Sequence, residues 1–240
     1  MDSDFGRKIQ DLAKERNSRL ILALDLLGSE GLLRSKSLVK GLKEHLVGVK
    51  IGYPTILSNQ AQNVAGFIAE FSDEVCFIAD AKIADVSHVN ALIGEILYSN
   101  GFDAVIAHGF MGYEGGLDGL SHVAHLKDKG LIILLSMSNK GAMAMMDNLV
   151  EGILREALKA GPSGFVAPAT RPEVIEKIRS EIPPIMKIFS PGVGAQGASP
   201  GSALSSGADY EIVGRAIYES TDPVSSAESI VRLQREAMAR

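Results

Sequence analysis

Eight short apolar segments recur along the chain, and each is followed by a stretch in which apolar residues have helical spacing. Continuous apolar runs of this length are typical of strands buried on both faces, as in a parallel sheet. The predicted strands are residues 19–24, 46–51, 75–79, 104–108, 131–135, 164–167, 185–189 and 209–213. Eight strand–helix units in 240 residues predict an α/β fold, a (β/α)8 TIM barrel in a single domain over residues 1–240. An open, doubly wound sheet is the alternative that this pattern leaves.

The intervals between the strands carry the predicted helices, at residues 32–45, 60–71, 89–99, 116–129, 142–160, 171–180 and beyond 215. A polar helix at about residues 1–17 is expected to precede the first strand. Lys187 and Glu211 interrupt the apolar pattern of the last two strands, and we interpret them as exposed at the base of the barrel.

Net charge and composition limit the class of protein. The formal net charge is −5, and no run of basic residues interleaved with aromatic residues occurs, which argues against nucleic-acid binding. No apolar run is long enough to cross a membrane, and the acidic start of the sequence lacks the apolar core of a signal peptide. The single cysteine, Cys76, cannot form an internal disulfide and is expected to be a buried apolar residue. These features together predict a cytoplasmic enzyme.

The segment Asp80-Ala-Lys-Ile-Ala-Asp85 places three charges at the end of the third predicted strand. Strand side chains alternate, so Asp80 and Lys82 should project to the same side, roughly 6–7 Å apart along the chain. Desolvating charges is costly, and folding seldom requires an acid–base–acid set at the mouth of a buried strand. We therefore interpret these residues as a candidate functional site, with an ordinary ion pair that caps the strand as the alternative.

Other predicted strands also end in polar residues. Asp25 follows the first strand, Lys50 lies near the end of the second, and Ser138 follows the fifth. Because the active site of a TIM barrel lies at the carboxyl ends of its strands, the charged residues of the first three strands should meet in one mouth. His108 ends the fourth strand, but a lone histidine there could simply form hydrogen bonds within the mouth.

The loop after the seventh predicted strand, Ser190-Pro-Gly-Val-Gly-Ala-Gln-Gly197, is rich in glycine. Such a backbone can turn its N–H groups toward an anion. Gln196 adds an amide donor, and Arg215, after the eighth strand, adds a guanidinium suited to phosphate. The loops after strands seven and eight are the usual phosphate site of a TIM barrel, so we predict phosphate binding here, with a plain glycine-rich turn as the alternative.

Taken in chain order, these motifs resemble archaeal orotidine 5′-monophosphate decarboxylase, and the resemblance spans Arg19 to Tyr218. The matching segments are Asp25, Lys50-Ile-Gly-Tyr-Pro54, Asp80-x-Lys82-x-x-Asp85, Met137-Ser138, Ser190-Pro-Gly-Val-Gly-Ala-Gln-Gly197 and Ile212-Val-Gly-Arg-Ala-Ile-Tyr218. The resemblance implies an enzyme of de novo pyrimidine biosynthesis that converts orotidine 5′-monophosphate to uridine 5′-monophosphate, without a cofactor or a metal ion.

The resemblance also implies roles for individual residues. Lys82 would donate a proton to C6 of the pyrimidine, and Asp80 would lie beside the departing carboxylate. Lys50 and Asp85 would complete a network of alternating charges, in which Asp85 comes from the second subunit of a homodimer with shared active sites. The implied substrate-binding residues are Asp25, Lys50, Asp80, Lys82, Asp85, Val86, Val89, Ser138, Pro191, Gly192, Val193, Gly194, Ala195, Gln196, Gly214 and Arg215.

Within this set, the resemblance assigns the parts of the nucleotide. Asp25 and Lys50 would bind the ribose hydroxyls, and Ser138 would bind the pyrimidine amide. Gln196 and Arg215 would bind the phosphate, with backbone from Gly214. Two residues depart from the usual pattern: Ala81 stands where these enzymes more often have Phe or Leu, and Val89 where archaeal enzymes often have a threonine near the ribose.

Two other functions are compatible with parts of the pattern. The metal-assisted 3-keto-L-gulonate 6-phosphate decarboxylases share the barrel and the Asp-x-Lys-x-x-Asp motif, but they place a magnesium-binding glutamate where this chain has Lys50. His122 and His125 share a helix face without a cluster of carboxylates, so no metal site is predicted. A non-enzymatic barrel that binds a phosphorylated ligand would need the glycine-rich loop but not Lys82 and its acids.

Overall fold

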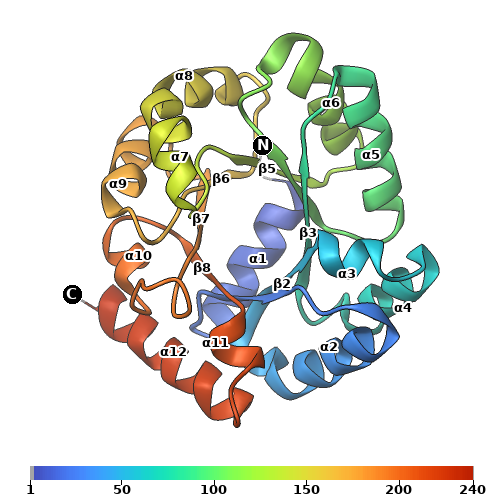
Figure 1. Cartoon of the computed structure of the whole chain (residues 1–240), viewed down its shortest axis with the longest axis vertical. Coiled ribbons are helices and arrows are strands. Elements are labelled where there is room, and N and C mark those ends of the chain that lie inside the picture. Colours follow the sequence, from blue (N-terminus) through green and yellow to red (C-terminus); the bar gives the residue numbers. More distant parts are fainter. Residues whose placement is uncertain (1–2, 240) are drawn as a thin grey trace.

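The computed structural model describes residues 3–239 and contains a closed barrel of eight parallel strands (Figure 1). The strands are β1 Leu20–Leu24, β2 Leu46–Gly52, β3 Cys76–Ile83, β4 Ala104–His108, β5 Gly130–Leu134, β6 Gly164–Val166, β7 Lys187–Pro191 and β8 Tyr210–Val213. Each strand pairs with the next one along the chain, and β1 also pairs with β8, which closes the barrel. The predicted TIM barrel is therefore confirmed.

Helices surround the barrel (Figure 1). They are α2 Gly28–Leu42, α3 Tyr53–Leu57, α4 Ala61–Phe71, α5 Ser87–Ser99, α6 Asp118–Leu126, α7 Lys140–Ala144, α8 Met146–Leu158, α9 Pro172–Glu181, α10 Ser202–Ser205, α11 Arg215–Tyr218 and α12 Pro223–Met238. Two short irregular turns, η1 Lys43–His45 and η2 Tyr113–Leu117, complete the connections. The predicted N-terminal helix is α1 Asp4–Glu15, and the first two residues of that prediction lie outside the described residues.

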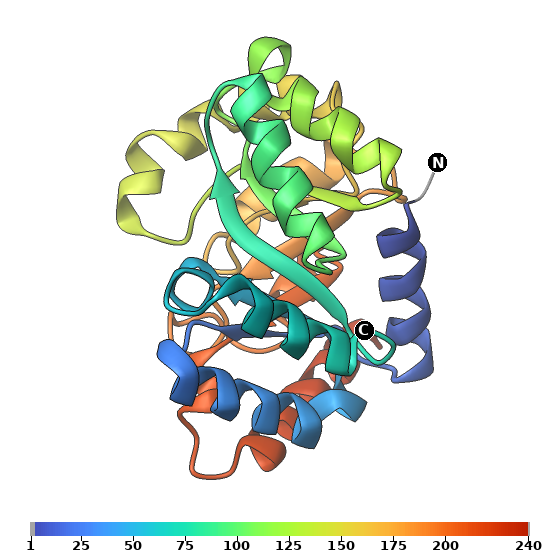
Figure 2. The same cartoon turned by 90° about the vertical axis from the view of Figure 1, so that its right-hand side faces the viewer.

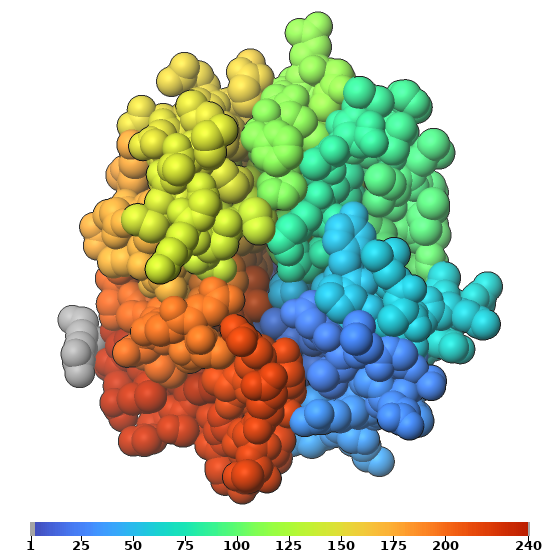
Figure 3. Space-filling view, in the orientation of Figure 1, coloured from blue at the N-terminus to red at the C-terminus, as the bar shows by residue number. Residues whose placement is uncertain are grey.

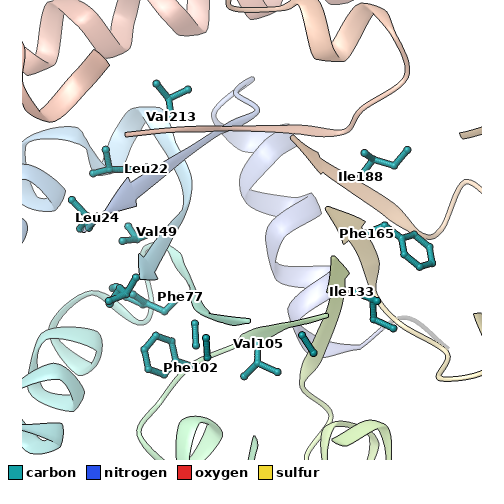
Figure 4. Packing of buried hydrophobic residues seen from close by; sticks show 14 of the residues in the cluster. Leu22, Leu24, Val49, Phe77, Phe102, Val105, Ile133, Phe165, Ile188 and Val213 are labelled. Atoms are coloured by element: carbon teal, nitrogen blue, oxygen red, sulfur yellow. The ribbon is translucent and has the colours of Figure 1, made fainter. Parts of the chain in front are cut away.

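Strand side chains alternate between the two faces of the barrel wall, and this alternation builds a core in two layers. Leu22, Val49 and Phe77 belong to the outer layer, between the strands and the helices (Figure 4). Their neighbours along the same strands, such as Ile21 and Cys76, belong to the inner layer, which fills the barrel. Burying both faces of every strand explains why the strands read as continuous apolar runs.

The helix α1 closes one end of the barrel. Phe5, Ile9 and Leu12 on this helix are buried against the inner layer, and the ring of Phe5 stacks on Phe189 with the centroids 6.1 Å apart. Figure 2 shows α1 on one side of the barrel and α7 on the opposite side. The carboxyl ends of the strands are therefore open on the side of α7, and that end holds the site.

The third strand is longer than the sequence predicts. The apolar run suggests an end at Ala79, but β3 continues to Ile83 because pairing with β4 resumes there, where Ile83 lies opposite Ala107. The register shifts between Ala79 and Ile83, and within this irregular stretch Lys82 has φ of 40°. A bulge of this kind redirects side chains at the end of a strand.

The two polar interruptions in the last strands are not exposed, contrary to the expectation. Glu211 is fully buried, and its carboxylate accepts hydrogen bonds from the backbone N–H groups of Gly201 and Ala203 and from the side chain of Gln234. Lys187 is half-buried, and its ammonium donates to the carbonyl of Pro184. Glu211 thus has partners that only the folded chain brings together, whereas the Lys187 ammonium has a partner three residues away in sequence.

Candidate active site

A cavity of about 270 Å³ opens at the carboxyl ends of the strands. Figure 3 looks onto this face, which is hollowed near its centre where segments from both halves of the chain meet. The residues around the cavity are Ala23, Asp25, Lys50, Asp80, Lys82, Ile106, Leu134, Ser136, Met137, Ser138, Val166, Pro191, Gly192, Val193, Ala195, Gln196, Ile212, Gly214, Arg215 and Tyr218. Asp25, Lys50, Asp80 and Lys82, from the ends of the first three strands, therefore meet in one cavity.

Asp80 lies between two ammonium groups. Its Oδ2 accepts a hydrogen bond from Lys50 Nζ at 2.7 Å, and its Oδ1 accepts one from Lys82 Nζ at 2.8 Å. Asp25 is farther away, with Oδ1 3.9 Å from Lys50 Nζ. The Lys50 side chain is almost completely buried, whereas the Lys82 side chain is 34% exposed and reaches into the open part of the cavity. The result is a chain of alternating charges with its one accessible ammonium at Lys82.

Strand register places Lys50 on the inner face of the barrel. It lies opposite Ala23 of β1 and Ile78 of β3, and both of these residues belong to the inner layer. Asp80 follows Ile78 by two positions and therefore points the same way. A Cβ atom at Gly52 would lie 1.8 Å from Asp25 Oδ1, so a glycine at that position lets the Asp25 carboxylate approach the lysine.

Opposing effects set the pKa of Asp80. Burial alone would raise it, because desolvation penalises the charged carboxylate. The charges and hydrogen bonds of Lys50 and Lys82 outweigh burial and lower the pKa below its usual value. Asp80 is therefore ionised at neutral pH and holds both ammonium groups in place.

The loop between β7 and α10 forms the other wall of the cavity. Gly192 and Gly194 have φ of 108° and 75°, values in the left-handed region that favours glycine. A hydrogen bond within the loop stabilises it: the Gly194 N–H donates to the Ala198 carbonyl at 2.8 Å. The side chains of Gln196 and Arg215 have no hydrogen bond or ion pair with other residues in the range 3–239. These two donors remain available to an anion in the cavity.

Comparison with known proteins identifies the family. The sequence matches the family described as "Orotidine 5′-phosphate decarboxylase / HUMPS family" over residues 18–230. The orotidine 5′-phosphate decarboxylase of Methanosarcina acetivorans is 39% identical over 216 residues, which are 90% of this chain and 94% of that protein. The chain belongs to this family.

Solved structures of orotidine 5′-monophosphate decarboxylase have the same fold. The enzyme from Metallosphaera sedula is 39% identical, with a TM-score of 0.78, and the match covers 92% of this chain and 99% of that one. The enzyme from Methanocaldococcus jannaschii, complexed with the inhibitor BMP, is 31% identical, with a TM-score of 0.81 and coverage of 90% and 98%.

Four of the residues predicted for the site of this decarboxylase family do not line the cavity: Asp85, Val86, Val89 and Gly194. Asp85 and Val86 are exposed where the chain leaves β3. The carboxylate of Asp85 accepts a hydrogen bond from the Val86 N–H at 2.7 Å, and within the described residues it forms no ion pair with Lys82. Within a single chain, the predicted network therefore lacks its last acid.

Several cavity residues were not predicted from the sequence. Ala23, Ile106, Leu134, Val166 and Ile212 are inward-facing residues near strand ends, and the alternation of strand side chains could have identified them. Ser136 and Met137 directly follow the fifth predicted strand, and Tyr218 ends the last matching segment, so their positions near predicted site residues could have identified them.

His108 lies outside the cavity lining and packs against Phe110, with ring centroids 4.7 Å apart. Burial and the nearby charge of Lys82 lower its pKa, so its imidazole is neutral at pH 7.

No group of three or more His, Cys, Asp or Glu side chains in residues 3–239 could hold a metal ion. Over the same residues, no helix combines the length and the apolar character needed to span a bilayer.

Proposed function

We propose that this protein decarboxylates orotidine 5′-monophosphate to uridine 5′-monophosphate, the reaction of its family in de novo pyrimidine biosynthesis. The observation that carries the proposal is the Lys50–Asp80–Lys82 arrangement beside a cavity with free phosphate donors. A site that only binds a nucleotide has no need of an ionised, buried carboxylate between two ammonium groups.

The charges suit the chemistry. Breaking the bond between C6 and the carboxylate leaves an electron pair at C6, and the carboxylate departs as CO₂. No cofactor is needed if a fixed ammonium stabilises the developing charge and then gives its proton to C6, and Lys82 is the accessible ammonium. Asp80 holds that ammonium in place and would lie beside the departing carboxylate. Loss of CO₂ would relieve the repulsion between the two anions.

The rest of the nucleotide has matching groups around the cavity. Gln196 and Arg215 would bind the phosphate, and Ser138 would bind the pyrimidine amide on the opposite wall. Asp25 and Lys50 would bind the ribose hydroxyls between these two ends. Binding energy from the remote phosphate could then order the loops around the reacting ring.

We further propose that the protein is a homodimer in which Asp85 enters the site of the partner. Asp85 lies outside its own cavity, two residues before α5, a helix that carries exposed apolar side chains. Leu92 and Ile96 are 61% and 60% exposed one turn apart on α5, and Leu57 of α3 is 77% exposed. Helices α3 and α5 lie on the side seen in Figure 2.

A cytoplasmic location fits the substrate, because a nucleotide with several negative charges does not cross a bilayer unaided.

The sugar-phosphate decarboxylases are the weaker alternative. Their chemistry requires a carboxylate for magnesium where this chain has the buried ammonium of Lys50. The named relatives at 39% identity are orotidine 5′-phosphate decarboxylases.

The test of the proposal is an absorbance assay of orotidine 5′-monophosphate with purified protein. Lys82→Ala should lose at least about a hundredfold in rate, because losing a general acid alone typically costs 10²–10⁴-fold. The variant should remain folded and still bind uridine 5′-monophosphate. Lys177→Ala, which removes a half-exposed lysine paired with Glu151, is the matched control and should keep full activity. A rate above about a hundredth of wild type in Lys82→Ala would contradict the assigned role of Lys82.

A further inference from the structure

A ring of three side chains, two buried and one partly buried, lies beside the active site, and the proposed reaction does not use it. Arg171 is 7% exposed just before α9, and its Nε lies 2.9 Å from Oδ2 of Asp147 in α8. The Arg171 Nη2 group donates to Ser136 Oγ at 3.0 Å, and Ser136 Oγ donates to Asp147 Oδ1. Each member of the ring therefore contacts the other two.

The same guanidinium holds the chain segment that enters the cavity. Arg171 Nη2 also donates to the carbonyl of Met137. Ser136, Met137 and Ser138 all line the cavity, whereas Arg171 and Asp147 do not. The orientation of the peptide between Met137 and Ser138 is thus fixed by a charged pair outside the cavity.

Leu135 and Ser136 are fully buried at the start of this segment, but Met137 and Ser138 are only partly buried and Asn139 is exposed. Residues 135–139 form neither helix nor strand, and the next element, α7, has only five residues. Met143 and Met145 beyond it are 56% and 67% exposed, so few apolar contacts fix this part of the chain. Arginine suits such a role because its planar guanidinium presents several donors in a fixed geometry.

The ring also lies close to the point where two walls of the cavity approach each other. A Cβ atom at Gly192 would lie 3.3 Å from Thr170 Cγ2, 3.5 Å from Gln196 Oε1 and 3.8 Å from Ser138 Cβ. Ser138 therefore lies directly opposite the loop that carries Gln196. Thr170 is adjacent to Arg171, so both walls meet where the ring is anchored.

We propose that Asp147 and Arg171 are positioning residues that hold the Ser138 hydroxyl where the pyrimidine binds. Asp147 fixes the guanidinium, the guanidinium fixes the Met137 carbonyl, and that peptide directs Ser138. This inference rests on the proposed function, in which Ser138 contacts the pyrimidine amide. Neither positioning residue touches the substrate.

A double-mutant cycle tests the route through Ser138. Asp147→Asn keeps the shape of the side chain and removes its charge, and it should lower kcat/KM for orotidine 5′-monophosphate by about 10²-fold, the cost of a small misplacement. In a Ser138→Ala background, the same substitution should have an effect of less than about threefold, because the group that it positions is already absent. Equal losses in both backgrounds would overturn the inference and leave only a structural role.

A second set of variants separates positioning from stability. In Asp147→Leu/Arg171→Met both charges are removed, and its Tm should exceed that of Asp147→Asn, because no buried charge is left unpaired. Its kcat/KM should stay low, since the Met137 carbonyl still lacks its donor. Asp209→Asn is the matched control: it breaks the ion pair with Arg179 at the other end of α9 and should lower Tm without changing kcat/KM. Recovery of kcat/KM in the double variant would refute the positioning role.

A measurement without catalysis keeps this inference distinct from the proposed function. Hydrogen exchange of residues 136–146 should become faster in Asp147→Asn and stay unchanged in Asp209→Asn. Unchanged exchange in Asp147→Asn would refute the positioning role. Wild-type protein that does not act on orotidine 5′-monophosphate would refute the proposed function, while the exchange result would still decide whether the ring orders this segment.

Discussion

Lys50 is a fixed positive charge at the point where two carboxylates approach each other. Its Nζ is 2.7 Å from Asp80 Oδ2 and 3.9 Å from Asp25 Oδ1, so the oxygen atoms that could attract a divalent cation already face an ammonium. We therefore expect chelators to leave activity unchanged. The measurement is the decarboxylation rate before and after EDTA treatment, with added Mg²⁺ as the control. Inhibition by EDTA that Mg²⁺ restores would favour the sugar-phosphate decarboxylases instead.

Arg215 offers a second prediction for a single residue. Its side chain is exposed at the cavity edge and has no hydrogen bond or ion pair within residues 3–239, so its removal should cost the fold little. Arg215→Ala should weaken binding of uridine 5′-monophosphate by about 1.5–3 kcal/mol, the value of a hydrogen bond to a charged group, and hardly affect uridine. Calorimetry with both ligands measures the difference. Equal losses for the nucleotide and the nucleoside would assign the arginine to structure rather than to phosphate.

Among the elements, β8 carries a buried acid that joins three parts of the chain. Glu211 accepts from the Gly201 N–H at 2.9 Å and from Gln234 Nε2 on α12 at 3.1 Å. Gln234 in turn accepts from the Arg19 N–H at the start of the barrel. The carboxylate thus fixes the far end of the β7–α10 connection, which also contains the predicted phosphate loop.

Glu211→Gln should destabilise the protein, because the new amide group turns one acceptor into a donor that faces other donors. Leaving one buried donor unsatisfied costs about 1–3 kcal/mol in the free energy of unfolding.

The same substitution has a pH-dependent effect. Burial raises the pKa of Glu211, although its hydrogen bonds oppose that shift. The advantage of the wild type over the variant should therefore shrink as pH rises from about 4.3, the unfolded value, through the raised folded pKa, and then stay constant. Urea unfolding at several pH values measures this difference, with Glu236→Gln on the exposed face of α12 as the control. An advantage that grows with pH would contradict the raised pKa.

Local signals in the sequence predict most of these elements. The apolar runs place β1 and β5 within one residue of their observed bounds, and alternation correctly puts Asp80 and Lys82 on the same side. The helix predicted over residues 142–160 is instead two helices, α7 and α8, which meet at Met145.

Contacts between distant segments are what the sequence could not supply. Nothing near Arg171 indicates that Asp147 is its partner, because the two residues lie on different helical units and meet only in the folded barrel. The sequence also gives no sign that Glu211 is buried, because the groups that donate to its carboxylate come from a later helix and an earlier loop. The turn at Lys82, with φ of 40°, depends on the pairing of β3 with β4 and has no signal of its own.

For the whole molecule, the proposed homodimer depends on the position of Asp85. This residue is exposed after β3 and lies outside the cavity that holds Lys82. In the proposed two-fold symmetric dimer, if Asp85 of one subunit enters the site of the other, the reciprocal contact follows by symmetry. Each site would then take Lys82 from one subunit and Asp85 from the other.

Mixed dimers give this arrangement a quantitative test. Homodimers of Lys82→Ala and of Asp85→Asn should both be severely impaired, because every site in them lacks one member of the network. In a mixed dimer one site carries both defects, while the other combines intact Lys82 and intact Asp85 from opposite chains. Co-refolding the two variants should therefore restore up to about half of the wild-type activity per mixed dimer, as two-fold symmetry requires. Different affinity tags on the two variants allow mixed dimers to be purified before the assay. Verified mixed dimers without activity would mean that Asp85 acts within its own chain or that the subunits do not share sites.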